Sequence, residues 1–366
     1  MNPTHALSRV GQSLWLDNIT RELLTSGTLK RYIDELSITG LTSNPTIFNQ
    51  AIKSGAAYDP FIRERLRAGQ SGESLFFEIA LEDITRAADL FAPVHERTAG
   101  VDGWVSLEVS PLLAYDTKTT LSEARDLHAR AGRPNVFIKI PGTAAGLPAI
   151  EEAVFAGVPI NVTLLFSTAQ YLAAAAAWLR GIERRIEANL NPHIGSVASI
   201  FISRWDTAVA GRVPSELTNR LGIAVAQQAF HAYSQLLESS RWRRVLNAGA
   251  RPQRLLFAST GTKDPKASDI LYIKGLAAPL TVNTMPEGTL KAFADHGELD
   301  AQLRTDGGDS EQVLSEFRKA GVDLDALAAK LQQDGAASFV ASWNELLGVI
   351  AAKGASLAKA SQDEFA

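Results

Sequence analysis

Short apolar runs rich in β-branched residues alternate along the chain with longer segments of helical periodicity, and this alternation repeats eight times. Repeated strand and helix units of this kind are typical of a parallel sheet. The pattern therefore predicts eight parallel strands. They cover residues 13–17, 38–45, 103–110, 135–142, 159–166, 196–203, 254–260 and 279–286.

The segments between these runs carry helix boundary signals. In residues 119–132, Thr120 and Glu123 have the spacing of a capping box, and Gly132 is placed to end the helix. Ser167 is placed to cap the next long helix, which contains the alanine run at 173–177. After residue 286 the chain shows amphipathic helical patterns at 309–321 and 338–360 with no strand between them.

Two folds fit eight strand and helix units, a closed (β/α)8 barrel and an open doubly wound sheet. No GxGxxG fingerprint follows the first run, which favours the barrel. We predict a single domain over residues 1–366, a (β/α)8 TIM barrel with additional C-terminal helices. Residues 11–286 would form the barrel, and 287–366 a helical tail packed on it.

Composition narrows the classes of function. Apolar residues make up 46% and charged residues 21%, as in an ordinary globular protein with a large core. The net charge of -4 is spread along the chain without a basic block, so we expect no nucleic-acid partner. The absence of cysteine rules out disulfides and cysteine nucleophiles. We find no leader segment and no apolar run of spanning length, and therefore expect a cytoplasmic protein without membrane contact.

Lys139 stands in the middle of the apolar run "VFIKI". Burial disfavours the charged form of a lysine, and a neutral amine is a nucleophile towards carbonyl carbon, so Lys139 is a candidate for Schiff-base chemistry. In the alternative interpretation the lysine stem covers apolar surface and its head reaches water.

Polar residues close the other predicted strands as well. Catalytic groups of a (β/α)8 barrel lie at the carboxyl ends of its strands, so these side chains would meet at one mouth. A lysine for addition to a ketone, carboxylates for proton transfer, amides for hydroxyl groups and cations for a phosphate suit a sugar-phosphate aldol reaction. The candidates are Asp17, Thr42, Asn44, Glu108, Lys139, Asn161, Thr163, Ser199, Arg204, Ser259 and Lys263.

Each candidate also has a structural interpretation. Asp17 or Asn18 could cap the helix that starts near residue 20, and "SNPT" could be only a turn. Glu108 could be a surface carboxylate, and Arg204 with Asp206 a solvated pair. Their shared position in successive units favours a common site.

Seven segments resemble the transaldolases, in particular the long bacterial form, in the same order along residues 11–286. They are "LWLDNI", "GLTSNPTIF", "VSLEVSP", "VFIKIPGTAAGLPAIE", "INVTLLFS", "SVASIFISRWD" and "LLFASTGTKDP". The resemblance implies a class I aldolase barrel without metal or organic cofactor. Such an enzyme moves a dihydroxyacetone unit from sedoheptulose 7-phosphate or fructose 6-phosphate to glyceraldehyde 3-phosphate or erythrose 4-phosphate, in the non-oxidative pentose phosphate pathway.

The resemblance also implies roles. Lys139 would form the Schiff base, Asp17 would be the acid and base, and Glu108 with Thr163 would hold a water. Asn44 and Asn161 would position the dihydroxyacetone unit, with Thr42, Ser199 and Ser259 in the site. Arg204 would bind phosphate. Shorter relatives place an arginine after the seventh strand where this chain reads "ASTGTKDP", so Lys263 is the candidate for the second cation.

Three other functions fit parts of the pattern. A metal-dependent aldolase is disfavoured because the histidines form no HxH or HExxH motif; they are His5, His95, His128, His193, His231 and His296. A plain Schiff-base aldolase would release free dihydroxyacetone from fructose 6-phosphate. A non-catalytic sugar-phosphate binder could use the same barrel. Exposed apolar positions on the tail leave a homo-oligomer open.

Overall fold

Eight parallel strands close into a barrel in which each strand pairs with the next and β8 pairs with β1. The structure is a computed structural model that describes residues 2–299 and 302–363. The closed barrel confirms the predicted (β/α)8 fold, and the alternative of an open doubly wound sheet is wrong. The strands are β1 Ser13–Asp17, β2 Ile38–Thr42, β3 Trp104–Glu108, β4 Val136–Pro141, β5 Ile160–Leu165, β6 Ser196–Phe201, β7 Arg254–Ala258 and β8 Val282–Met285.

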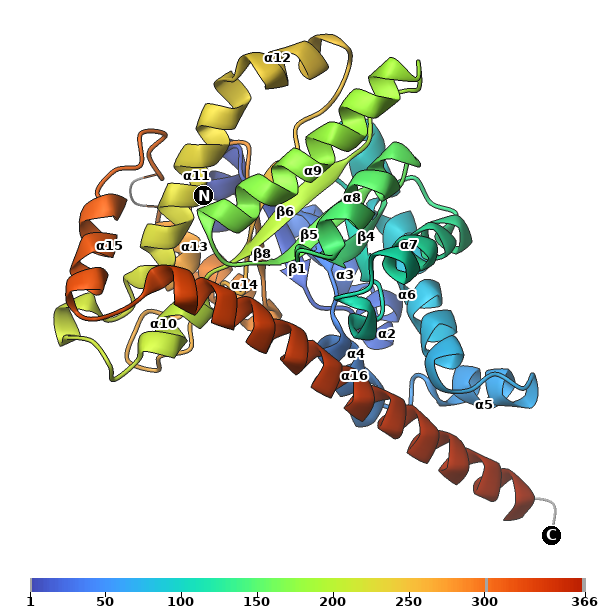
Figure 1. The fold of residues 1–366 in the computed structure, drawn as a ribbon. Coiled ribbons are helices and arrows are strands. Elements are labelled where there is room, and N and C mark those ends of the chain that lie inside the picture. Colours follow the sequence, from blue (N-terminus) through green and yellow to red (C-terminus); the bar gives the residue numbers. More distant parts are fainter. Residues whose placement is uncertain (1, 300–301, 364–366) are drawn as a thin grey trace.

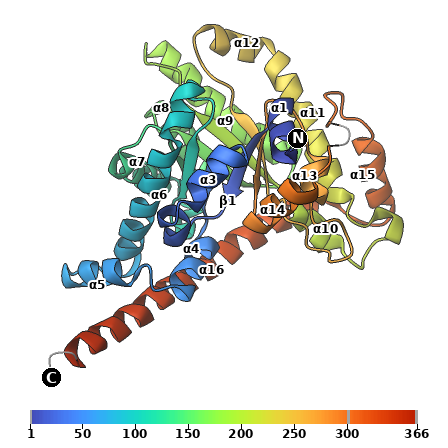
Figure 2. The same ribbon diagram turned by 180° about the vertical axis from the view of Figure 1, so that it is seen from behind.

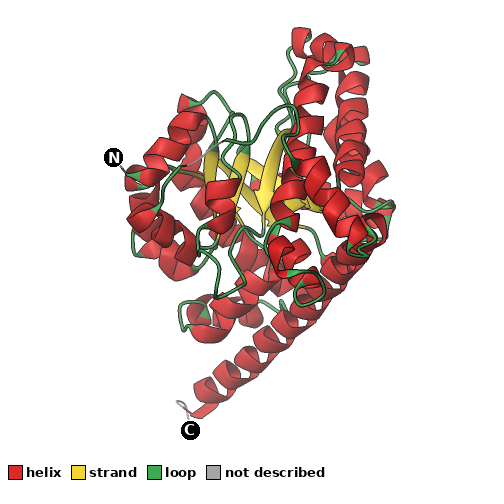
Figure 3. Cartoon of the chain, turned by 90° about the vertical axis from the view of Figure 1, so that its left-hand side faces the viewer, coloured by secondary structure: helices red, strands yellow, loops and turns green. Residues whose placement is uncertain are grey.

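Helices surround this barrel on the outside (Figures 1 and 3). They are α1 Pro3–Val10, α2 Arg21–Thr25, α3 Thr28–Glu35, α4 Pro45–Ser54, α5 Asp59–Arg67, α6 Gly72–Arg97, η1 Pro111–Leu113, α7 Thr117–Ala131, α8 Gly146–Phe155, α9 Thr168–Glu187, α10 Ser203–Val209, η2 Ser215–Leu217, α11 Leu221–Glu238, α12 Ser240–Asn247, α13 Leu271–Gly275, α14 Glu287–His296, α15 Ser310–Lys319 and α16 Leu324–Asp363. Because helices cover the outer face and side chains fill the interior, all positions of β4, β5 and β6 are buried.

The helix caps were predicted correctly in two cases. Ser167 and Gln170 form a full capping box at the start of α9, and Gly132 ends α7 in the left-handed conformation. The predicted capping box of Thr120 and Glu123 is wrong. Asp116 caps α7 instead, because its carboxylate accepts the Thr119 amide, so Thr120 already lies inside the helix.

The last helix, α16, crosses the carboxyl ends of the strands and then extends past α4 and α5 (Figures 1 and 2). It starts at Leu324, well before the predicted 338. Trp343 anchors it in an aromatic cluster, with its ring edge-on to Phe76 at a centroid distance of 4.8 Å. Further along, the Lys353 ammonium pairs with Asp59 at 2.8 Å. The C-terminal helix is therefore held along much of its length by contacts with the rest of the chain.

Among the described residues, α16 is the one helix that is long and apolar enough to cross a membrane by length and composition. The apolar pattern of the sequence did not reveal such a segment. This is weak evidence for a membrane span, because a helix that packs on a protein core passes the same test. Phe339, Trp343, Leu346 and Ile350 of α16 are all buried in the folded chain.

The packing of β1 on β2 gives a test of the barrel. A Cβ atom on Gly40 would lie 2.5 Å from the Trp15 ring, whose indole nitrogen is fixed by a 2.7 Å hydrogen bond to Asp102. We expect Gly40→Ala to lower the free energy of unfolding by about 1–3 kcal/mol, as overpacking does. Urea denaturation measures the change. Gly288→Ala in α14 is the control, since no atom lies within 4 Å of its Cβ position; equal effects of the two substitutions would contradict the packing argument.

Candidate active site

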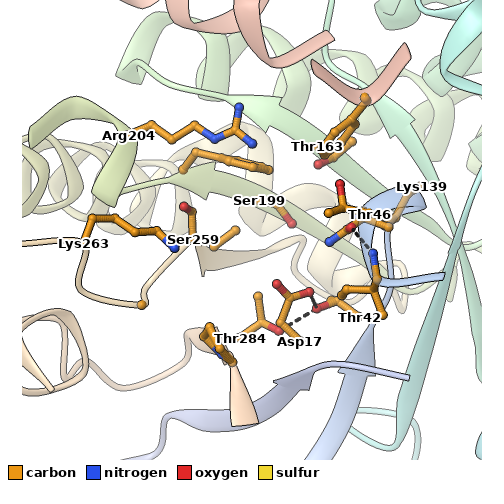
Figure 4. Close-up of a pocket in the computed structure, with 17 residues that line it drawn as sticks. Asp17, Thr42, Thr46, Lys139, Thr163, Ser199, Arg204, Ser259, Lys263 and Thr284 are labelled. Carbon is orange, nitrogen blue, oxygen red and sulfur yellow. Dashed lines mark hydrogen bonds between the residues drawn. The ribbon is translucent and has the colours of Figure 1, made fainter. Parts of the chain in front are cut away.

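A cavity of about 220 Å³ opens at the carboxyl ends of the barrel strands. Every predicted site residue lines it except Glu108 and Asn161 (Figure 4). These two are buried and hydrogen-bonded to the lining residues Lys139 and Ser199. The closed barrel thus brings together side chains from separate parts of the sequence. The lining residues are Asp17, Thr42, Asn44, Thr46, Ile47, Lys139, Thr163, Ser199, Phe201, Arg204, Ala258, Ser259, Gly261, Lys263, Thr284, Pro286 and Phe339.

Lys139 lies on β4, and its side chain is only 7% exposed. Its Nζ donates hydrogen bonds to the Ser43 carbonyl at 3.0 Å and to Oε2 of Glu108 at 3.1 Å. The alternative interpretation, with the lysine head in water, is therefore wrong. The interpretation of Glu108 as a surface carboxylate is also wrong, because that residue is 5% exposed.

Strand register explains this pairing. Glu108 on β3 lies opposite Lys139 on β4, which in turn lies opposite Asn161 on β5. Neighbouring residues of parallel strands point to the same face, so the three side chains form one row inside the barrel. The Asn161 amide is held from both sides: its oxygen accepts from Ser199 at 2.7 Å, and its nitrogen donates to Ser106 at 3.1 Å.

Two polar atoms beside Lys139 have no partner in the part of the chain that the structure describes. They are Oε1 of Glu108 and the Thr163 hydroxyl, both buried. Buried polar groups normally have a hydrogen-bond partner, which can be a water or a ligand. These two atoms are therefore candidates to hydrogen-bond a water or a ligand.

Asp17 is the last residue of β1, and its carboxylate accepts a hydrogen bond from a chain of two threonine hydroxyl groups. Thr42 donates to Oδ1 of Asp17 at 2.8 Å, and the Thr284 hydroxyl lies 2.6 Å from that of Thr42 (Figure 4). Because Thr42 has one proton and gives it to Asp17, Thr284 is the donor in the second bond. The helix α2 is capped by Thr20, so the interpretation of Asp17 as a cap is wrong.

Burial dominates the electrostatics of both carboxylates. It raises the pKa of Asp17, against the opposing effects of Lys139, Thr42 and Lys263. Burial also raises the pKa of Glu108, while the Lys139 charge opposes this and the Asp17 charge adds to it. Both groups are therefore shifted towards the range in which a carboxyl group can give and take protons near neutral pH.

Asn44 serves as a helix cap and also faces the cavity. Its side-chain oxygen accepts the Ile47 amide at 3.1 Å, and Pro45 occupies the first turn of α4. The interpretation of "SNPT" as only a turn is therefore wrong, because the segment starts α4 and Asn44 also lines the cavity. The cap uses the oxygen of the amide, which leaves the amide nitrogen as the group that can donate to a ligand.

Two cations lie on the opposite side of the cavity from Lys139 (Figure 4). Arg204 comes from α10 and Lys263 from the loop after β7. The predicted solvated pair of Arg204 with Asp206 is wrong, since Asp206 is buried and accepts from Tyr272 and from the amides of Leu221 and Gly222. Ser259 has a φ of 55° at the end of β7, where its hydroxyl meets that of Ser203 at 2.8 Å.

Several lining residues were not predicted from the sequence. Thr284 lies near the carboxyl end of β8, as the candidates do on their strands, so the same rule would have found it. Phe339 comes from α16, and no local signal in a helix far beyond the last strand indicates that it returns to the cavity. Among the described residues, no three histidine, aspartate or glutamate side chains gather in a way that could hold a metal ion.

Comparison with known proteins covers nearly the whole chain. Residues 14–350 match the model of the transaldolase/fructose-6-phosphate aldolase family. A transaldolase from Arthrobacter sp. (strain FB24) is 43% identical, with 98% of this chain and 99% of the relative covered. A transaldolase from Thermobifida fusca (strain YX) is 44% identical, with 96% and 98% covered. Transaldolase 2 from Nostoc sp. (strain PCC 7120) is 37% identical, with 95% and 96% covered.

A carboxyl group on α7 gives a test of how burial shifts a pKa in this chain. Glu123 accepts the Ser110 amide at 2.6 Å, and burial, with the charges of Glu73 and Asp126, raises its pKa from 4.5 to about 7. A raised folded-state pKa means that the folded chain gains stability from the protonated form below pH 4.5 and loses it as the pH rises to about 7. Glu123→Gln keeps the acceptor but does not titrate. We expect the free energy of unfolding of this variant, relative to that of the native chain, to rise by about 1–2 kcal/mol between pH 5 and pH 8.

Urea denaturation at the two pH values measures this gain. Glu238→Gln, at an exposed position, serves as the control and should show no such trend. If Glu123→Gln and the native chain lost stability in parallel, the carboxyl group of Glu123 would not titrate in this range.

Proposed function

Because the chain belongs to the transaldolase and fructose-6-phosphate aldolase family, we propose that it is a transaldolase. It would transfer a dihydroxyacetone unit from a ketose phosphate, such as sedoheptulose 7-phosphate or fructose 6-phosphate, to glyceraldehyde 3-phosphate or erythrose 4-phosphate. The observation that carries this proposal is the buried Lys139 amine beside Glu108, on a cavity with two cations at its other side. The relatives named transaldolase, at 42–44% identity, support it.

The first step is imine formation at Lys139. Its ammonium group passes a proton to Glu108, 3.1 Å away, and the neutral amine adds to the ketone carbon of the substrate. Glu108 then returns the proton to the carbinolamine hydroxyl, which leaves as water and gives the iminium ion. Glu108 and Thr163 would hold that water until the imine is hydrolysed, and the buried oxygens of these two residues that have no partner support this role.

The second step is cleavage of the carbon–carbon bond between the α and β carbons of the iminium, where the β carbon carries the hydroxyl group of the departing aldose. Asp17 takes the proton of the hydroxyl group on the departing side, the bond breaks, and an aldose phosphate leaves. The electron pair moves into the iminium, which becomes a neutral enamine on Lys139. An acceptor aldehyde then reacts by the reverse sequence, in which Asp17 returns its proton. The hydroxyl chain from Thr284 through Thr42 orients Asp17 for both transfers.

The rest of the cavity would bind and orient the sugar. Asn44 and Ser199 line the cavity and can hydrogen-bond the hydroxyl groups of the dihydroxyacetone unit, and Asn161 would position that unit through its hydrogen bond with Ser199. Arg204 and Lys263 lie across the cavity, with Ser259 close by, and can hold the phosphate of donor or acceptor. This separation fits a substrate whose carbonyl and phosphate groups lie at opposite ends.

We also propose the setting in which this reaction runs. The chain would act as one domain in the cytoplasm, in the non-oxidative pentose phosphate pathway, with sugar phosphates as its partners. It would need no metal or organic cofactor, because the Lys139 iminium can serve as the electron sink.

Two alternatives share most of this site. A fructose 6-phosphate aldolase would release free dihydroxyacetone from the same imine, and the matched family includes such enzymes. A sugar-phosphate binder would need neither the amine nor the acid and base. The retention of Lys139, Glu108 and Asp17 in one buried arrangement favours an enzyme over a binder.

Borohydride trapping tests the imine. The native chain is incubated with fructose 6-phosphate, reduced, digested and analysed by mass spectrometry. We expect a dihydroxyacetone-derived adduct on the peptide with Lys139, because reduction fixes the imine at that nitrogen. Lys139→Met should give no adduct and no turnover.

Product analysis of the same preparations separates the alternatives. With an aldose phosphate acceptor, a transaldolase forms the exchanged ketose phosphate, whereas an aldolase accumulates free dihydroxyacetone. An unmodified Lys139 in a chain that binds the sugar would support the binder and sink the proposal.

The phosphate end of the site gives a second test. Arg204→Gln removes a charge-assisted contact, which contributes about 1.5–3 kcal/mol and so roughly 10- to 100-fold in kcat/KM for fructose 6-phosphate. Lys263→Gln should act in the same direction. The comparison substrate is fructose, which has no phosphate. The two substitutions should therefore change kcat/KM for fructose little. A matching loss for both sugars would show that these cations do not bind the phosphate.

A further inference from the structure

One side chain of α16 ties together the ends of two catalytic strands. The amide nitrogen of Gln332 donates to the Leu164 carbonyl at 2.9 Å and to the Gly142 carbonyl at 3.1 Å. Leu164 directly follows Thr163 on β5, and Gly142 comes three residues after Lys139, just past β4. Gln332 is not among the residues that line the cavity, so its effect on the reaction would be indirect, through the backbone that it contacts.

The backbone that Gln332 contacts is unusual. The register of β5 against β6 shifts between Val162 and Leu165, as in a β-bulge, and Leu164 has a φ of 58°. A left-handed conformation is costly for a leucine and persists only where the surroundings hold it. A bulge also changes the direction of the side chains next to it, and here the next side chain is that of Thr163.

Gly335, one turn along α16, brings the helix close to the same bulge. A Cβ atom at this position would lie 2.9 Å from Cδ2 of Leu164 and 3.5 Å from Nη1 of Arg204. The helix therefore packs against the Leu164 side chain while Gln332 binds the Leu164 carbonyl. Both contacts come from one face of α16, which Trp343 and Lys353 anchor further along.

We propose that Gln332 is a positioning residue that holds the β5 bulge, so that the Thr163 hydroxyl faces the Lys139 and Glu108 pair. This inference rests on the proposed function and assigns the C-terminal helix a part in it. Loss of the two hydrogen bonds would free Leu164 to relax and would move Thr163 away from the water it holds. A displacement of about 1 Å in a catalytic arrangement can cost roughly 100-fold in rate.

The test compares three substitutions in the full chain. Gln332→Met removes the donor at similar length, and we expect kcat to fall about 10- to 100-fold while KM for the sugar phosphate changes little. Gln332→Lys restores a donor and should recover most of the loss, since Lys353 of the same helix already binds two backbone carbonyls, those of Ile52 and Gly55. Gln333→Met, at the exposed neighbouring position, is the control and should behave like the native chain.

A second measurement does not depend on turnover. Hydrogen exchange of the backbone at residues 160–166 should become faster in Gln332→Met and stay unchanged in Gln333→Met. Native kcat together with native exchange in Gln332→Met would overturn the inference. A native chain without a borohydride adduct would overturn the proposed function instead, while faster exchange in Gln332→Met would still show that Gln332 holds the bulge.

Discussion

The buried ion pair between Lys139 and Glu108 is the constraint on which the site depends. Neither charge could be placed in the barrel alone, because an unpaired buried charge costs several kcal/mol, whereas the pair offsets much of that cost. The register of β3 and β4 sets the two residues opposite each other, so the barrel itself makes the pair. A proton can move within the same pair with little change in net charge, and in the proposed reaction this would let the lysine act as a nucleophile while it stays buried.

The barrel also separates the other charges by function. The two carboxylates Asp17 and Glu108 lie in buried surroundings that raise their pKa, and both feel the Lys139 charge. Arg204 and Lys263 lie across the cavity, where they can meet a phosphate. The Lys263 charge lowers the pKa of Asp17, so an anion bound by Lys263 would cancel part of that effect and favour the protonated form of Asp17. This division follows from which strand ends are neighbours in a closed barrel.

Local sequence patterns predicted those features that depend on neighbouring residues or on strand position. The apolar runs gave the barrel, and the closing polar residue of each run gave most of the cavity, including Lys139 and Asp17. The capping box at Thr120 failed because Asp116 offers a better cap four residues earlier, and Glu123 is used by the Ser110 amide instead. Phe339 and Gln332 could not be predicted, since their roles arise only when α16 folds back across the strand ends, and no short pattern in a helix encodes that return.

The C-terminal helix contacts the mouth of the barrel as well as the outer helices, through Phe339 at the cavity and Gln332 at the strand ends. Strand ends in a barrel lack the pairing that fixes strand centres, and β5 ends in a bulge with a left-handed leucine, which is a conformation that the barrel alone does not stabilise. A long helix anchored at Trp343 and Lys353 can supply the missing contacts from outside. Residues on one face of the helix follow each other at a regular spacing, so several of them reach the mouth of the barrel. The proposed positioning of Thr163 and the place of Phe339 in the cavity lining would thus have the same origin, the docking of α16 on the barrel.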